Sequence, residues 1–151
     1  IVAAGAWSGQ LLAQVGVTFP SIPVRGQIAQ LSTSSPYLRC VIERGKKYLV
    51  PRPDGLVIVG STEERGTYTK QATLSGISGL LKFAEEIVPC LNAAEVLRTW
   101  SGIRPGTPDE LPFIGRIPCF SNLLIASGHF RSGLQMSPGT SILLKQSILG
   151  S

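Results

Sequence analysis

Short apolar runs and alternating apolar and polar positions fill much of the chain, a pattern typical of short β-strands. These stretches lie at residues 24–31, 40–42, 47–50, 56–59, 96–100 and 123–126, and a further buried strand is expected at 1–5. The segment Pro51-Arg52-Pro53-Asp54-Gly55 lies between two of them and has the chemistry of a turn. It therefore predicts an antiparallel hairpin.

The spacing changes from Leu74 onward, where apolar residues recur at three- and four-residue intervals. This spacing predicts a one-sided helix over 74–88, with Thr73 as its N-cap and Pro89 as its stop. A short helix is expected after Ser8, and a last helix is expected to begin at Ser137 and Pro138. A Gly- and Pro-rich loop is expected over 102–112.

Composition narrows the class of protein. The chain has 151 residues, of which 43% are hydrophobic, 17 are Gly and 11 are Pro. Such a chain can bury a proper core, which excludes disorder, and its many turn residues disfavour a bundle of long helices. No apolar run approaches the roughly 18 residues of a membrane span. The predicted fold class is α+β with an α/β edge, a mostly antiparallel sheet flanked by helices.

Charge and cysteine content exclude several partners. The net charge of +5 is scattered along the chain, and without a basic face and stacking aromatics we expect no nucleic-acid binding. The three cysteines are odd in number and far apart, so neither a disulfide framework nor a metal site is expected. A reducing, cytoplasmic setting is the interpretation that follows.

Counting excludes several kinds of catalysis as well. His129 is the single histidine, and no G-x-S-x-G elbow is present. The adjacent pairs Glu63-Glu64 and Glu85-Glu86 are expected to diverge and face solvent. What remains is Arg104, in a Gly- and Pro-rich segment, and Arg131, just after a buried strand. A guanidinium can hold a carboxylate with two parallel hydrogen bonds. The alternative from composition is a surface arginine paired with Asp109 or Glu110.

Six motifs occur in an order that resembles a known family. They are VAAGAWS at 2–8, PVRGQ at 23–27, YLVPRPDG at 48–55, IVGST at 58–62, SGIRPGTPDELPFIG at 101–115 and ASGHFRSGLQMSP at 126–138. Together they resemble the C-terminal half of glycine oxidase and the related flavin-dependent D-amino acid oxidases and dehydrogenases. The resemblance spans essentially the whole chain.

This resemblance implies a domain organisation. Residues 1–19 would be the last strand and helix of a Rossmann-like FAD-binding domain, 20–112 a substrate domain, and 113–151 the return to the FAD-binding domain. The family's G-x-G-x-x-G turn, which binds the pyrophosphate, is absent from these residues. We therefore expect a fragment that alone binds FAD weakly or not at all. Amino acid metabolism and thiamine biosynthesis are the context that the resemblance implies.

The resemblance also implies site residues. Arg104 resembles the substrate-carboxylate arginine, Tyr48 the tyrosine that helps to hold that carboxylate, and Arg131 a second active-site arginine. The implied cofactor contacts are Gly5, Trp7, His129, Phe130, Arg131, Ser132, Gly133, Leu134 and Gln135. Trp7 and Trp100 are expected in the core more than as contact residues. A structural role is the alternative for Tyr48, packed in the sheet, and for His129, satisfied by backbone hydrogen bonds.

The implied reaction is the oxidation of a small amino acid. Hydride would pass from Cα to the flavin, and the resulting imine would be hydrolysed, with oxygen or another acceptor taking the electrons. If the last helix points its N-terminus at the ring, its dipole would stabilise reduced flavin. Ser132 and the run Gln135-Met136-Ser137 depart from the family pattern. They leave open how the protein tunes the flavin and how the flavin reacts with oxygen.

Three alternatives stay open at this point. The first is a non-catalytic carboxylate-binding or subunit-interaction domain. The second is a dehydrogenase that passes its electrons to a quinone or a protein. The third concerns assembly, since a homo-oligomer is compatible with the sequence.

Overall fold

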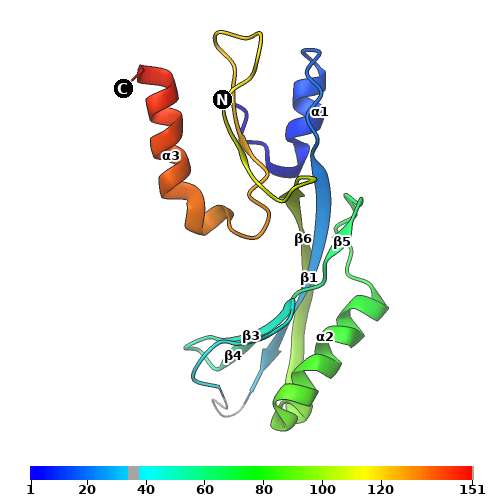
Figure 1. Ribbon diagram of the computed structural model, residues 1–151. Helices are drawn as coiled ribbons and strands as arrows, with labels where there is room; N and C mark the ends of the chain where they lie inside the picture. Colours follow the sequence, from blue (N-terminus) through cyan, green and yellow to red (C-terminus); the bar gives the residue numbers. More distant parts are fainter. Residues whose placement is uncertain (34–37, 151) are drawn as a thin grey trace. The chain divides into compact units, whose positions relative to one another are not determined.

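The computed structural model describes residues 1–33 and 38–150, which form two compact units (Figure 1). The first unit comprises 1–24, 65–67 and 103–151, and the second comprises 25–64 and 68–102.

The second unit is built on an antiparallel hairpin meander. Strands β2 (Ile42–Arg44), β3 (Lys47–Pro51) and β4 (Leu56–Gly60) follow one another, and β4 pairs antiparallel with β1 (Ile22–Ser32). The turn over 51–55 joins β3 and β4, with Val50 opposite Ile58, which confirms the predicted hairpin. The sheet order is β2-β3-β4-β1-β5, with β5 at Glu64–Arg65, and β6 (Glu95–Gly106) also pairs with β1.

Helix α2 (Leu74–Ile87) covers this sheet as the spacing predicted. The Thr73 hydroxyl accepts the N–H of Gly76 at 3.2 Å and caps the helix. Leu80 and Phe83 face the sheet, in one core with buried residues of β1, β3 and β4. Each such side chain contributes about 1.5–3 kcal/mol by burial. The 3₁₀ helix η2 (Pro89–Ala93) follows directly, so Pro89 does end the α-helix.

The first unit has a smaller sheet and a smaller core. Strands β7 (Phe113–Arg116) and β8 (Leu124–Ser127) pair antiparallel, and Val2 adds a single parallel bridge to Ile125. The 3₁₀ helix η1 (Gly5–Trp7) leads into α1 (Ser8–Ala13), and α3 (Gly133–Leu149) contacts β7 and β8. The core of this unit joins Val2, Leu12, Ile117 and Ile125.

Three predicted boundaries of the first unit were wrong. The strand expected at 1–5 reduces to the bridge at Val2, because the chain turns into η1 at Gly5, where φ is +55°. Ser8 lies inside α1 and is buried, and Trp7 holds the N-cap position without a capping side chain. Strand β6 continues to Gly106, so residues 102–106 of the loop expected over 102–112 are extended strand instead.

The last helix also begins earlier than predicted. It starts at Gly133 and contains Pro138, which has no N–H to offer the carbonyl of Leu134. The Ser137 hydroxyl donates to that carbonyl at 2.8 Å, so a side chain replaces the missing backbone hydrogen bond. None of the residues of α3 is buried. No helix among the described residues is long and apolar enough to cross a membrane.

Candidate active site

The two segments that carry the candidate arginines, the end of β6 and the loop after β8, are joined by a backbone hydrogen bond. Arg104 is half-buried near the end of β6, and the next residue, Pro105, accepts the N–H of Phe130 at 2.9 Å. Phe130 directly precedes Arg131, which is exposed. The first unit therefore brings the segments of Arg104 and Arg131 together, as the predicted site requires.

The backbone that presents Arg131 has an unusual conformation. Gly128 has φ of +89° and Phe130 has φ of +50°, the left-handed region that non-glycine residues rarely adopt. Gly128 packs on Thr107, which is fully buried and donates its hydroxyl to the Leu111 carbonyl at 2.9 Å. The loop after β8 is thus held against the segment that follows Arg104. Backbone of this kind is concentrated at binding sites.

The acidic residues that could pair with Arg104 at the surface have other contacts. Glu110 forms an ion pair with Arg65, whose guanidinium lies 5.8 Å from the centre of the Phe130 ring. The carboxylate of Asp109 accepts the N–H of Leu111 at 3.1 Å. The alternative that a surface arginine pairs with Asp109 or Glu110 stays a prediction for Arg104 and Arg131.

His129 is tied to the last helix through its side chain. Its Nε2 atom lies 2.9 Å from the Thr140 hydroxyl, in the second turn of α3. The structural alternative for His129 was a ring held by backbone hydrogen bonds, whereas this contact is to a threonine side chain. Burial lowers the pKa of His129 from its ordinary value of 6.5, because the cation loses solvation. The neutral ring is therefore favoured at physiological pH.

The remaining predicted cofactor contacts surround this loop and the chain's first turn. Ser132 is the N-cap of α3, and Gly133, Leu134 and Gln135 form its first turn, whose N–H groups lack acceptors within the helix. The helix N-terminus therefore lies at Gly133, not at Ser137. Trp7 is 37% exposed, so the expectation that it sits in the core was wrong. Trp100 is half-buried, with the Arg98 guanidinium 4.8 Å from its ring centre.

FAD fits two features of the first unit. The Ser8 hydroxyl is fully buried and has no hydrogen-bond partner within the described chain, which leaves a polar atom for a bound group. Gly5 has φ of +55° with open space where a Cβ would lie, so a ligand can approach its backbone. If FAD binds, these residues and the first turn of α3 would contact it. The described residues contain no cluster of three metal-ligating side chains.

Tyr48 lies in the second unit, on β3, and is half-buried. Its ring packs over Gly60 of β4. Arg104 and Arg131 belong to the first unit. The convergence of Tyr48 with these arginines stays a prediction.

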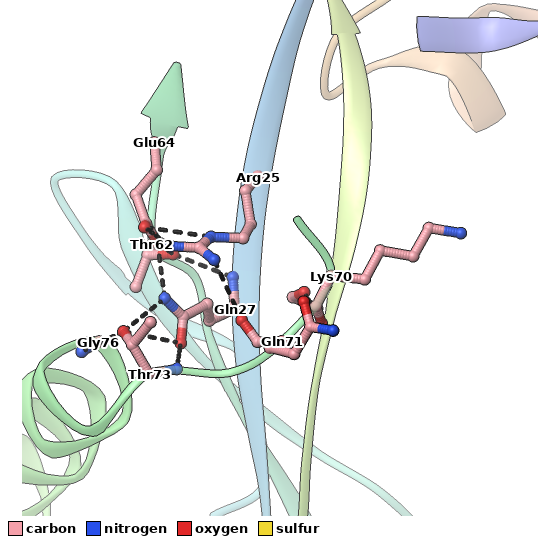
Figure 2. Close-up of polar contacts among 9 residues, drawn as sticks. Arg25, Gln27, Thr62, Glu64, Lys70, Gln71, Thr73 and Gly76 are labelled. Carbon is pink, nitrogen blue, oxygen red and sulfur yellow. Dashed lines mark hydrogen bonds and ion pairs between the residues drawn. The ribbon is translucent and has the colours of Figure 1, made fainter. Parts of the chain in front are cut away.

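Sequence reasoning missed a polar cluster in the second unit, made of Arg25, Gln27, Thr62, Glu64 and Thr73 (Figure 2). Gln27 is fully buried, and its amide donates to Glu64 at 2.7 Å and accepts the N–H of Thr73 at 2.7 Å. Arg25 pairs with Glu64 and also donates to the Gln71 carbonyl at 3.1 Å. The cluster fixes the segment between β4 and α2.

The surroundings of the two acidic pairs differ. Glu63 and Glu64 diverge as predicted, toward Lys46 and Arg25 respectively, but neither is fully exposed, so their solvent-facing placement was wrong. Burial raises the pKa of Glu64, yet hydrogen bonds from Arg25, Thr62 and Gln27 and the Arg25 charge outweigh it, and the pKa falls below 4.5. Glu85 and Glu86 are exposed. The PVRGQ segment was the available signal, since it places an arginine and a glutamine in a buried strand.

Known proteins match the chain over nearly its whole length. Glycine oxidase of Pseudomonas putida is 36% identical over 150 residues, covering 99% of this chain and 41% of that protein. Glycine oxidase of Bacillus subtilis is 35% identical, with 99% and 40% covered. The crystal structure of glycine oxidase from Geobacillus kaustophilus superposes with a TM-score of 0.90 at 34% identity, covering 95% of this chain and 39% of that one.

These relatives are longer proteins, and the chain spans about two fifths of their length. The crystal structure of L-proline dehydrogenase from P. horikoshii, at 26% identity and a TM-score of 0.89, has the same fold over 99% of the chain. The sequence profile described as FAD dependent oxidoreductase (DAO) matches residues 1–146. The chain thus belongs to the DAO family of FAD-dependent oxidoreductases.

Proposed function

We propose that this chain is part of an FAD-dependent enzyme that oxidises a small amino acid, such as glycine or a small D-amino acid, to an imine. The observation that supports this most is the hydrogen bond from the Phe130 N–H to the Pro105 carbonyl, at 2.9 Å. It joins the strand end that carries Arg104 to the loop that carries Arg131. Two cations on joined segments suit a substrate with a carboxylate.

Each candidate residue has a proposed task. Arg104, which is half-buried, would hold the carboxylate in a bidentate contact, and the Tyr48 hydroxyl would donate to the same group. Arg131 would lie near the substrate and the ring. Holding the carboxylate would fix the position of Cα relative to the flavin. This positioning would supply most of the rate acceleration. Bound FAD would supply the hydride acceptor.

The protein also has to keep the substrate amine neutral at the moment of hydride loss, because its lone pair forms the imine. The ammonium form first loses a proton to water. The Cα–H bond would then break with its electron pair leaving as hydride, while the nitrogen lone pair forms the C=N bond of an iminium ion. Loss of a second proton to water gives the imine, and water later replaces nitrogen at the carbon and releases ammonia. A neutral His129 would add no positive charge to those of Arg104 and Arg131. No acid–base pair is required for this scheme.

The proposed domain assignment is that residues 1–19 and 113–151 belong to an FAD-binding domain and residues 20–112 to a substrate domain. Two features of the first unit support it. Helix α3 has no buried residue, and it exposes large apolar side chains such as Leu134, Ile142 and Leu149. The Val2 bridge to Ile125 is parallel, as expected at the edge of a Rossmann-like sheet.

The test uses the 151-residue chain and the full-length gene product side by side. Each is mixed with FAD, freed of unbound flavin, and measured by visible absorbance and by turnover of glycine, sarcosine and small D-amino acids. We expect stoichiometric flavin and turnover in the full-length product, and weak binding without turnover in the 151-residue chain. A full-length product that binds a carboxylate but neither FAD nor an oxidisable amino acid would favour the non-catalytic alternative.

The electron acceptor is tested separately from the substrate. The fold shared with L-proline dehydrogenase favours testing a dehydrogenase as well as an oxidase. Flavin reoxidation is therefore followed with oxygen and, separately, with an artificial quinone-like dye under nitrogen.

We further propose a cytoplasmic location, since Cys40, Cys90 and Cys119 are free and exposed thiols, which suits a reducing compartment.

A further inference from the structure

The ring of Tyr48 lies over the backbone of Gly60 on the neighbouring strand. The two residues are direct partners in the β3–β4 register. A Cβ built at Gly60 would lie 2.4 Å from Cζ of Tyr48 and 2.5 Å from both Cε2 and the hydroxyl oxygen. The hydroxyl end of the ring therefore occupies the space that any other residue at position 60 would fill.

The backbone of Gly60 is held on its other side, so it cannot yield easily. Gly60 pairs with Ile28 of β1. Two residues further on, the Thr62 N–H donates to the Gln27 carbonyl at 3.3 Å, and the Gln27 N–H donates to the Thr62 hydroxyl at 2.9 Å (Figure 2). The tyrosine is only half-buried and carries its hydroxyl at the far end of a side chain. A Cβ at position 60 would displace the ring rather than the strand.

We propose that Gly60 is a positioning residue that sets where the Tyr48 hydroxyl points. This inference rests on the proposed role of Tyr48 in holding the substrate carboxylate. A ring whose hydroxyl end packs against a glycine has few alternative directions, so its hydroxyl is ordered before the substrate arrives. Binding then loses less conformational entropy than it would with a freely rotating tyrosine.

The test is a double-mutant cycle in the full-length gene product, with Gly60→Ala, Tyr48→Phe and the combined variant. Tyr48→Phe removes a hydrogen bond to a charged group, and a loss of about 10- to 100-fold in kcat/KM is expected. Gly60→Ala should lose a similar factor, mostly through KM. If the glycine acts only through the hydroxyl, the combined variant loses no more than either single variant. Additive losses would overturn the inference.

A matched control and a structural readout separate this role from a folding defect. Gly79→Ala adds a Cβ in the same unit that meets nothing within 4 Å, and it should keep wild-type kinetics. In the 151-residue chain, the Gly60 Hα resonances should carry a ring-current shift that disappears in a Tyr48→Leu variant. An unshifted Gly60 resonance in the wild-type chain would overturn the inference without reference to activity.

The failures of the two proposals are distinguishable. A wild-type product that carries FAD and oxidises no amino acid would remove the proposed function, and with it the task of Tyr48. An active wild type whose Gly60→Ala variant stays within twofold in kcat/KM would leave the proposed function in place and remove the inference alone. A folded Gly60→Ala variant with raised KM supports the inference.

Discussion

The Cα atom of Gly128 lies so close to the side chain of Thr107 that a Cβ at Gly128 would fall 2.6 Å from the threonine methyl group. Thr107 is fully buried and Gly128 has φ of +89°, so neither residue can move aside cheaply. The contact holds the segment after Arg104 against the loop before Arg131. It makes the geometry of both loops depend on one glycine.

Gly128→Ala should destabilise the first unit by about 2–4 kcal/mol, since the left-handed backbone disfavours a side chain and the added methyl group overlaps Thr107. Urea unfolding of the 151-residue chain measures this. Gly139→Ala is the matched control, because its Cβ would meet nothing within 4 Å and it lies in helix α3. A Gly128→Ala chain as stable as wild type would show that the loop adapts freely.

Arg104→Ala should reduce kcat/KM of the full-length product by at least about a hundredfold, because a buried carboxylate left without its cation costs roughly 3–5 kcal/mol. Lysine should restore little, since it lacks the planar fork. Steady-state kinetics with glycine and small D-amino acids check both. Arg39→Ala is the control at an exposed arginine. An Arg104→Ala enzyme within threefold of wild type would remove this residue from the site.

Acid should weaken the second unit through Glu64. The pKa of this carboxyl lies below its ordinary 4.5 in the folded chain, so its contribution is present in full above that value and is lost as pH falls through the folded value. Urea midpoints between about pH 3 and 6 should show this acid loss, and Glu64→Gln should flatten it. Glu86→Gln, which removes an exposed partner of Arg44, is the control. Equal slopes in wild type and Glu64→Gln would contradict the prediction.

His129 should titrate below 6.5, because burial disfavours its charged form. Its pKa is lower in the folded state than in the unfolded state, so stability is full above 6.5 and falls as pH drops from 6.5 toward the folded value. As the single histidine, it gives one assignable imidazole signal, and proton NMR between about pH 5 and 8 measures it directly. A midpoint above 6.5 would show that the ring gains a partner for its charged form instead.

The hairpin and helix α2 could be predicted because local chemistry and burial agree there. A turn rich in Pro, Asp and Gly joins β3 to β4, and the apolar spacing of α2 matches the face that carries Leu80 and Phe83. The polar cluster around Gln27 could not be predicted, because polar residues in a strand normally indicate a solvent-exposed face. Gln27 is buried only because Glu64 and Thr73, distant in sequence, satisfy its amide.

Boundaries near glycine and proline were the least predictable. Gly102, Pro105 and Gly106 indicate a loop by composition, yet pairing extends β6 to Gly106. Pro138 was expected in the first turn of a helix, but it lies in the second turn. The Leu134 carbonyl, which receives no N–H from Pro138, accepts the Ser137 hydroxyl instead. Arg104 and Arg131 stand out from their Gly- and Pro-rich or strand-end surroundings, and their roles came from resemblance to the family. The contact that joins their loops, between Phe130 and Pro105, involves backbone atoms and leaves no mark in the sequence.

None of the residues of α3 is buried, and this links the binding of the cofactor to the covering of the helix by another surface. The helix begins inside the predicted flavin loop, and His129 is bonded to Thr140 further along it. Any surface that covers the apolar side chains of α3 would therefore also restrain the loop. By thermodynamic linkage, each would strengthen the other: cofactor binding would favour coverage of the helix, and coverage would favour cofactor binding by the same factor.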